Sequence, residues 1–270
     1  MSATFQPVET RPARLWRRGE AGDVPVDRPL ADEAPVGLLY DGRPHVVLMA
    51  TPADVEDLAI GFTLTERIAG FGDIAAVAVE TLDEGLQVDV RLAAAGRRGR
   101  AKARVRTLEG RSSCGLCGVQ RLAQAVRPLS PLPEGPVVAR AAVEAALDAL
   151  ERQQALGRLT RAMHAAALAD ADGALVLVRE DVGRHNALDK LAGAAARRGL
   201  DPAGGFALIT SRCSYEMVEK AAVAGVRLLV AISAPTALAI RKAEECGMTL
   251  VALARADGCA VFTRPDRIAP

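Results

Sequence analysis

Aromatic residues and net charge are both scarce in this chain of 270 residues. Phe, Trp and Tyr together make up 3 % of it, so stacking on nucleobases cannot be a widespread means of binding. The 34 Lys and Arg residues are balanced by 33 Asp and Glu residues, which leaves a formal net charge of +1. This balance argues against a nucleic-acid coat or a membrane-surface protein, and we expect any polyanionic ligand to bind at a local basic patch.

Long apolar runs are missing as well. No run approaches the roughly 18 residues that a membrane span requires, so we expect no membrane partner. The first thirty residues are rich in Arg and Pro and lack the apolar centre of a secretory signal, which favours a cytoplasmic protein. Five cysteines in so long a chain do not indicate a disulfide framework, and a reducing compartment leaves their thiols available for chemistry.

Changes in composition divide the chain into four parts. Residues 1–32 are expected to form a flexible, loosely ordered arm, and residues 33–127 an α+β domain that ends in a loop with two cysteines. Residues 128–136 contain four prolines and are typical of a linker. Residues 137–270 are expected to form a larger α/β domain.

The amino-terminal domain has clear local patterns. Asp41-Gly42 separates two apolar runs, which predicts a β-hairpin over residues 36–49. Thr51-Pro52 predicts the start of a helix, with the threonine as N-cap and the proline in the first turn. Alternating apolar residues over 86–92 predict a half-buried strand.

In the carboxy-terminal domain, apolar runs alternate with helical segments. An amphipathic helix is expected around Val143 to Leu150, and the later helices are expected to end near glycines. This alternation predicts a mainly parallel sheet covered by helices, with ligands at the carboxyl ends of the strands. The strand-like runs are 174–178, 206–209, 228–232 and 249–253, and the glycines are Gly199, Gly225 and Gly247.

Polar residues follow each of these runs, in the segments 180–186, 211–214, 233–236 and 254–258. Hydroxyls and backbone N–H groups at helix starts bind anions, although simple N-capping explains any one Ser or Thr equally well. Convergence of four such loops favours a phosphate-bearing ligand. His185, next to Arg184, could orient or protonate a phosphate or sulfur species, or could be a helix-cap histidine. His164, in an Ala-rich run, is expected to be a core histidine.

The two cysteines of the first domain, Cys114 and Cys117, have Cys-x-x-Cys spacing behind an Arg-rich segment. Nearby positive charge activates a thiol as a nucleophile. Structural zinc needs about four ligands, and the remaining cysteines and histidines are dispersed, so no metal site is expected. A thioredoxin-like redox pair normally follows the first strand of a compact fold, whereas this pair lies in the middle of the chain.

A nucleobase deaminase would carry His-x-Glu and Pro-Cys-x-x-Cys. Ser113 stands in place of that proline, and His164 is followed by two alanines. The interpretation that remains is a thiolate that accepts a group and passes it on. Cys213, Cys246 and Cys259 are expected to be small buried apolar residues.

Several longer motifs resemble those of the FdhD family, the formate dehydrogenase accessory sulfurtransferases. The resemblance covers nearly the whole chain after the arm. It rests on Thr51-Pro52 through Glu66, Ser113-Cys114-Gly115-Leu116-Cys117-Gly118, His164 to Leu168, Glu180-Asp181-Val182-Gly183-Arg184-His185-Asn186 through Lys190, Ser214 to Ala222, and Ser233 to Ala239.

This resemblance implies a sulfur carrier that accepts persulfide sulfur from a cysteine desulfurase. It implies that Cys114 holds the persulfide and that Cys117 assists. The sulfur would go to a molybdenum (or tungsten) bis-guanine-dinucleotide cofactor before that cofactor enters formate dehydrogenase. The resemblance also implies a homodimer, and a cytidine deaminase-like fold for the carboxy-terminal α/β domain beside the smaller α+β domain.

In the family, a cofactor-contacting segment corresponds to the residues Leu253, Ala254, Arg255, Ala256, Asp257 and Gly258. Arg184, His185, Ser214 and Thr236 complete the candidate cofactor site, for which a guanine nucleotide such as GDP is a mimic. The chain departs from the family pattern at three places: Ala252-Leu253 replaces Gly-Phe, Arg161-Ala162 replaces glycines, and Thr210-Ser211-Arg212 replaces Ser-Gly-Arg.

A sulfurtransferase is the leading hypothesis. The alternatives are a non-catalytic, cofactor-binding chaperone for formate dehydrogenase and a redox- or zinc-binding protein.

Overall fold

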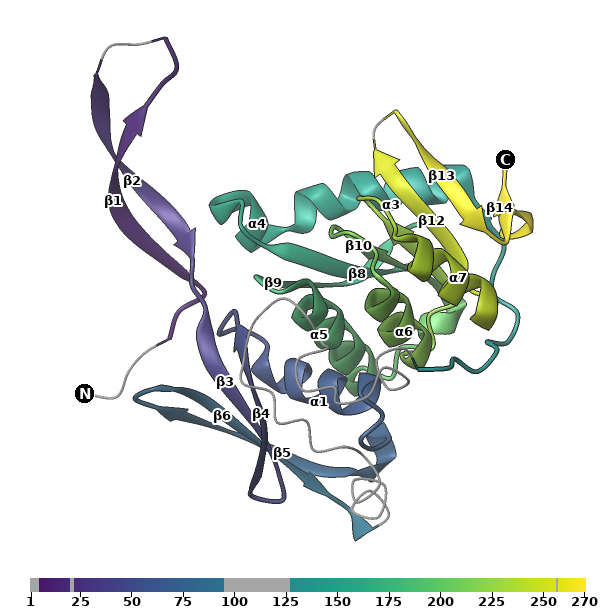
Figure 1. Cartoon of the computed structure of the whole chain (residues 1–270), viewed down its shortest axis with the longest axis horizontal. Coiled ribbons are helices and arrows are strands. Elements are labelled where there is room, and N and C mark those ends of the chain that lie inside the picture. The colour runs from purple at the N-terminus through teal and green to yellow at the C-terminus, as the bar shows by residue number, and fades with distance from the viewer. Residues whose placement is uncertain (1–4, 20–21, 95–126, 256) are drawn as a thin grey trace.

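A computed structural model describes residues 5–19, 22–94, 127–255 and 257–270. They form a long two-stranded ribbon, a four-stranded sheet with one helix, and a six-stranded sheet with helices on both faces (Figure 1). The ribbon projects from the rest of the molecule (Figure 1).

The amino-terminal arm is more ordered than the sequence suggests. Strands β1 (Val8–Trp16) and β2 (Asp23–Ala31) pair antiparallel along their whole length, so the prediction of a loosely ordered arm is wrong here. The prediction rested partly on the prolines of the arm, which do not interrupt the pairing of the two strands. The prolines lie in the pairs Pro12↔Asp27, Arg14↔Pro25 and Thr10↔Pro29, which are every second pair of the ladder. Hydrogen-bonded and non-hydrogen-bonded pairs alternate along an antiparallel ladder, so all three belong to the same kind. Residues in the non-hydrogen-bonded pairs point their N–H groups away from the partner strand, so prolines at such positions remove no hydrogen bond from the ladder.

The four-stranded sheet has the order β4-β3-β6-β5. Its strands are β3 (Ala34–Tyr40), β4 (Arg43–Ala50), β5 (Ile74–Leu82) and β6 (Gly85–Leu92). Asp41 and Gly42 both have positive φ between β3 and β4, which confirms the predicted hairpin. Alternate side chains such as Leu38 and Val88 face helix α1 (Val55–Thr65) and form a core with its Leu58 and Phe62.

Helix α1 begins later than predicted. Its N-cap is Asp54 rather than Thr51, and the Asp54 side chain makes no capping hydrogen bond. The Thr51 hydroxyl instead accepts a hydrogen bond from Val182 N at 3.1 Å, and Thr51 N donates to Asp181 Oδ2 at 3.0 Å. Contacts with the second domain therefore outweigh the local capping preference.

The six-stranded sheet has the order β13-β12-β11-β10-β8-β9. Its strands are β8 (His164–Asp170), β9 (Leu175–Asp181), β10 (Gly205–Ile209), β11 (Leu228–Ala231), β12 (Thr249–Arg255) and β13 (Gly258–Thr263). Strands β10, β11 and β12 are parallel, as predicted. Strands β8 and β13 run antiparallel to their neighbours, so the sheet is mixed rather than mainly parallel.

Helices cover both faces of this sheet (Figure 1). One face packs against α5 (Arg184–Arg197), α6 (Tyr215–Val223) and α7 (Ala237–Cys246), and the other against α3 (Arg140–Gln153). The glycines after α5, α6 and α7 all have positive φ, as expected of C-caps. Helix α4 (Ala155–Thr160) contacts the ribbon.

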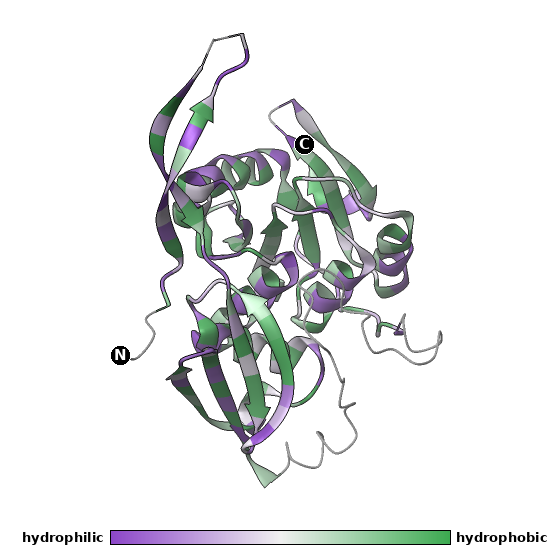
Figure 2. Cartoon of the chain, turned by 60° about the vertical axis from the view of Figure 1, so that its left-hand side comes forward, coloured by the Kyte–Doolittle hydropathy of each residue, from purple (hydrophilic) through white to green (hydrophobic). Residues whose placement is uncertain are grey.

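The remaining elements are short: η1 (Phe71–Asp73), η3 (Pro202–Gly204), η4 (Pro265–Arg267), and the paired strands β7 (Val138–Ala139) and β14 (Ile268–Ala269). The strands of the large sheet are apolar, and the helices present hydrophilic residues outward (Figure 2). Among the described residues, no helix is both long enough and apolar enough to span a bilayer.

The two sheets are joined through α1 and α5, which cross almost backbone to backbone. A Cβ atom on Gly61 would lie 1.7 Å from the carbonyl oxygen of Asp189, and one on Gly193 would lie 2.0 Å from that of Asp57. Glycine is therefore required at both positions. The Asp57 carboxylate completes the junction by accepting hydrogen bonds from Arg179 and Arg197.

Candidate functional site

The loops that the sequence predicted lie together along the edge of the six-stranded sheet at which its parallel strands end. The parallel order places the carboxyl ends of β10, β11 and β12 there, together with the end of β9 and the start of β8. Backbone bonds connect neighbouring loops: Cys213 N donates to Ala234 O at 3.2 Å, and Leu253 N donates to Ser233 O at 3.3 Å. The edge is thus a continuous surface with three helix N-termini.

Two of those N-termini lack a side-chain cap. Gly183 precedes α5 and has no side chain, while Ser214 precedes α6 without capping it. The Ser214 hydroxyl is buried and has no hydrogen-bond partner among the described residues. Thr236 differs, because its hydroxyl accepts a hydrogen bond from Ala239 N at 3.2 Å and caps α7. N-capping therefore explains Thr236, but it does not explain Ser214.

His185 is the second residue of α5, and its mostly buried side chain faces α6. Its Nε2 is 3.2 Å from Glu216 Oε2, close enough for an ion pair when the ring is protonated. Burial opposes ionisation of Glu216, but His185 and then Arg184 outweigh it and hold the pKa of that carboxyl below its usual value. The His185 ring therefore lies against a carboxylate of the next helix and does not cap its own helix.

His164 belongs to the same edge, which the sequence did not indicate. It begins β8, pairs in register with Asp181, and is only half-buried rather than a core residue. Burial lowers its pKa, and the positive charge of Arg184 lowers it further. Both effects favour the neutral form of the imidazole.

Arginines give the edge a positive character. Arg161, Arg212 and Arg255 are exposed at the start of β8, after β10 and at the end of β12, and Arg184 begins α5. The carboxylate of Glu180 at this edge is occupied by the protein, because it accepts hydrogen bonds from the backbone N–H groups of Leu156 and Gly157. The arginine-rich edge, defined by these four arginines, is a surface suited to an anion. Arg212 lies in the segment 211–214 that the sequence predicted as a ligand loop. Sequence reasoning did not assign Arg161 to the site, although this arginine replaces a glycine of the family pattern.

Asp181 at this edge is held by a fully buried partner. Its Oδ2 lies 2.6 Å from Lys190 Nζ, and neither side chain is exposed to solvent. Its Oδ1 accepts hydrogen bonds from Gly183 N at 2.7 Å and from the Asn186 side chain at 3.0 Å. The pair fixes the turn that carries Arg184 and His185.

The segment Leu253 to Gly258 connects β12 to β13. Leu253 has φ of 55° at a β-bulge, an uncommon conformation for a leucine, and its side chain is partly exposed. Ala254 is buried in the core and is almost entirely inaccessible to a ligand. Arg255, Asp257 and Gly258 are exposed, and Ala256 lies outside the described residues.

The predicted reactive residues Cys114 and Cys117 also lie outside the described residues. Cys213 and Cys246 are buried as expected, and burial raises the pKa of Cys213 to about 12, so it is not a nucleophile. Cys259 is exposed, which contradicts the prediction that it is buried. Within the described ranges, no cluster of three or more His, Cys, Asp or Glu side chains is arranged to hold a metal ion.

Comparison with known proteins matches residues 31–269 to the model of the FdhD/NarQ family. The sulfur carrier protein FdhD of Xanthomonas euvesicatoria is 47 % identical over 257 residues, which cover 94 % of this chain and 91 % of that protein. The protein of the same name from Cupriavidus necator is 46 % identical over 254 residues, or 94 % and 87 % of the two chains.

A similar solved structure supports the fold. A crystal structure of a candidate formate dehydrogenase accessory protein from Desulfotalea psychrophila superposes with a TM-score of 0.75 at 24 % identity, covering 97 % of this chain and 99 % of that one. The family match and the identity to its members extend over almost the whole sequence. This chain therefore belongs to the FdhD/NarQ family.

Proposed function

We propose that the protein is a sulfur carrier that serves the maturation of formate dehydrogenase. The observation that carries the proposal is the identity of 43–47 % to proteins named sulfur carrier protein FdhD, over 94 % or more of this chain in the first four relatives. Cys114 is the residue that would carry the sulfur, with Cys117 as its partner. The donor is a cysteine desulfurase, and the protein works in the cytoplasm as a homodimer.

The chemistry begins with thiol–persulfide exchange. The Cys114 thiolate attacks the outer sulfur of the donor persulfide, the donor S–S bond breaks, and the donor cysteine leaves as a thiolate. Cys114 then holds the same sulfur as a persulfide, so the exchange needs no outside oxidant or reductant. On delivery the new S–S bond breaks, a nucleophilic acceptor takes the outer sulfur, and Cys114 leaves as the thiolate.

We propose that the arginine-rich edge holds the acceptor, a molybdenum (or tungsten) bis-guanine-dinucleotide cofactor. The edge suits its diphosphates, because the uncapped N-termini of α5 and α6 and the unpartnered Ser214 hydroxyl point to an anion. Arg184, His185 and Thr236 lie at the same helix starts, and the segment from Leu253 to Gly258 forms the far side. In this proposal the carboxy-terminal domain is cytidine deaminase-like and lacks the deaminase carboxylate, since two alanines follow His164.

Titration of GDP into the full chain by calorimetry tests the cofactor site. Arg212→Glu and Arg255→Glu should each weaken binding at least tenfold, because each replaces a cation near the phosphates by a like charge. Arg91→Glu is the matched control, since Arg91 lies exposed on β6 in the other sheet. The cofactor assignment fails if GDP does not bind, or if all three variants bind it as the unchanged protein does.

A cofactor-binding chaperone is the second candidate, because the arginine-rich edge would serve it equally well. Replacing both Cys114 and Cys117 by Ala separates the two functions. A sulfur carrier loses the ability to activate formate dehydrogenase in cells that depend on it. A chaperone retains that ability, provided that the variant still binds GDP.

A further inference from the structure

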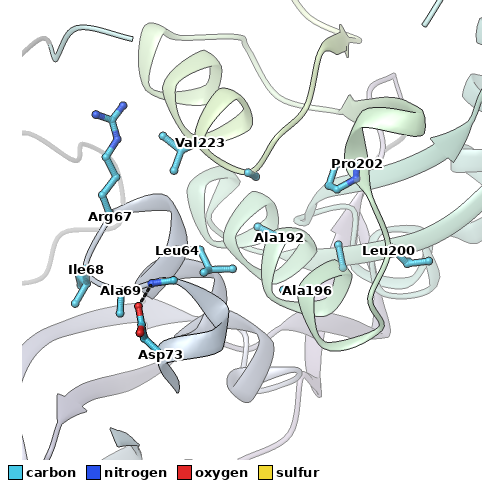
Figure 3. A pocket seen from close by; sticks show the side chains of 13 residues that line it. Leu64, Arg67, Ile68, Ala69, Asp73, Ala192, Ala196, Leu200, Pro202 and Val223 are labelled. Atoms are coloured by element: carbon cyan, nitrogen blue, oxygen red, sulfur yellow. Dashed lines mark hydrogen bonds between the residues drawn. The ribbon is translucent and has the colours of Figure 1, made fainter. Parts of the chain in front are cut away.

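An apolar hollow lies at the opposite ends of the helices that form the arginine-rich edge. It has a volume of about 550 Å³ and opens between the end of α1, the last turns of α5 and the end of α6 (Figure 3). The edge is built on the first turns of α5 and α6. The 14 residues of α5 span about 20 Å, so the hollow and the edge are separate surfaces.

Small side chains leave this hollow open. Ala192, Ala195 and Ala196 line it from α5 at the spacing of a single helix face. Leu64, Leu200 and Val223 form the surrounding walls and are only partly buried. A branched apolar side chain from another molecule would fit here against the alanines and bury the exposed apolar surface of Leu64, Leu200 and Val223.

Arg67 places a positive charge at the α1 side of the hollow (Figure 3). Its side chain is exposed, and the nearest carboxylate oxygen among the described residues is Glu219 Oε1 at 3.9 Å, too far for a hydrogen bond. Glu219 is also shared with Arg127 at 3.7 Å. Asp73, also at the rim, accepts a hydrogen bond from Gly70 N at 3.3 Å. The Arg67 guanidinium therefore keeps donors for a carboxylate from outside.

We infer that the hollow is a docking site for an amphipathic helical segment of a partner protein. The segment inserts a leucine-like side chain against the α5 alanines and places a Glu or Asp carboxylate beside Arg67. An open apolar groove with the exposed Arg67 guanidinium at its α1 side matches the way such helices bind, through apolar anchors one turn apart and a flanking charge. This inference does not depend on the sulfur-carrier proposal.

Methyl NMR of the full chain with labelled alanines tests the inference. Three synthetic helical peptides serve as probes: one with two leucines flanked by Glu, one with alanines in place of the leucines, and one with Lys in place of Glu. The Leu–Glu peptide should shift the methyl signals of Ala192, Ala195 and Ala196, and the other two should bind at least tenfold more weakly.

Two variants then separate charge from shape. Arg67→Glu should reverse the preference between the Glu and Lys peptides, and Ala196→Leu should weaken both because it fills the hollow. Arg241→Glu, exposed on α7, should leave the preference unchanged. The inference is overturned if no peptide shifts the three alanine signals, or if Arg67→Glu leaves the preference intact. Sedimentation that shows Ala196→Leu dissociating a dimer would also overturn it, because a second copy of the chain would then cover the hollow.

Discussion

At the scale of single residues, the most consequential group is the buried lysine of α5. Lys190 Nζ lies beside Asp181 and also donates to the carbonyl oxygen of Thr51 at 3.0 Å. One ammonium group thus connects the β9–α5 turn with the segment that leads into α1. Burying two charges carries a desolvation cost that their attraction offsets, and removing one member leaves the other charge uncompensated.

Replacing Lys190 by Met should lower the free energy of unfolding by about 3–5 kcal/mol, because Asp181 is left as an unpaired buried charge. Urea denaturation followed by circular dichroism measures the loss. Arg91→Met is the control, since the Arg91–Asp89 pair is exposed and 3.8 Å apart, and its removal should change stability by less than about 0.5 kcal/mol. Equal stability of the two variants would contradict this account of the buried pair.

His164 predicts a pH dependence. Its folded-state pKa is lowered by burial and then by Arg184, so the unfolded chain binds a proton more readily than the folded chain. The stability associated with the neutral ring is complete above the unfolded pKa of about 6.5, and is lost as the pH falls from there through the lower folded pKa.

The stability of the unchanged protein should therefore fall relative to that of His164→Gln between pH 7 and pH 5. Above pH 7.5 the difference in stability between the two proteins should stay constant. Thermal melts at half-unit pH steps give the comparison. If the difference in stability stays constant between pH 7 and pH 5, or if the unchanged protein gains stability relative to the variant, His164 does not titrate as the structure implies.

At the scale of elements, the close crossing of α1 and α5 is the joint between the two sheets. Gly61→Ala would place a methyl group 1.7 Å from Asp189 O, so the helices must separate. The expected loss in the free energy of unfolding is about 3 kcal/mol or more, at the upper end for overpacking. Gly72→Ala is the matched control, because nothing lies within 4 Å of its Cβ position. Urea denaturation that finds both variants equally stable would contradict the crossing.

Elements with a strong local signal could be predicted from the sequence, and elements set by distant partners could not. The β3–β4 hairpin follows from Asp41-Gly42, and the ends of α5, α6 and α7 follow from their glycines. Thr51 looked like a helix cap, yet its hydrogen bonds go to Asp181 and Val182, more than a hundred residues away. No local pattern encodes that contact.

The same distinction applies to the candidate site. The loops after β9, β10, β11 and β12 could be placed together because parallel strands end at one edge. Strand β8 could not be placed, because its Ala-rich sequence has no strand periodicity and it pairs antiparallel in the interior of the sheet. His164 and Arg161 were missed for that reason.

At the scale of the whole molecule, two units with separate cores share one closely packed junction. The carboxy-terminal unit presents the arginine-rich edge, and the amino-terminal unit leads into the segment that contains Cys114 and Cys117. Arg127, the first described residue after that segment, is bonded to Glu66 of the α1 C-cap at 3.1 Å. The chain thus leaves the cysteine segment beside the C-terminal end of α1, the helix that joins the two units.

The central claim is that Cys114 carries sulfur, and intact-mass measurement tests it most directly. The full chain is incubated with a cysteine desulfurase and cysteine, and its mass is recorded before and after a thiol reductant is added. The account predicts a reducible gain of one sulfur atom that Cys114→Ala abolishes, while Cys259→Ala, which removes the exposed cysteine of β13, retains it. A Cys114→Ala protein that still gains the sulfur in full yield would contradict the account.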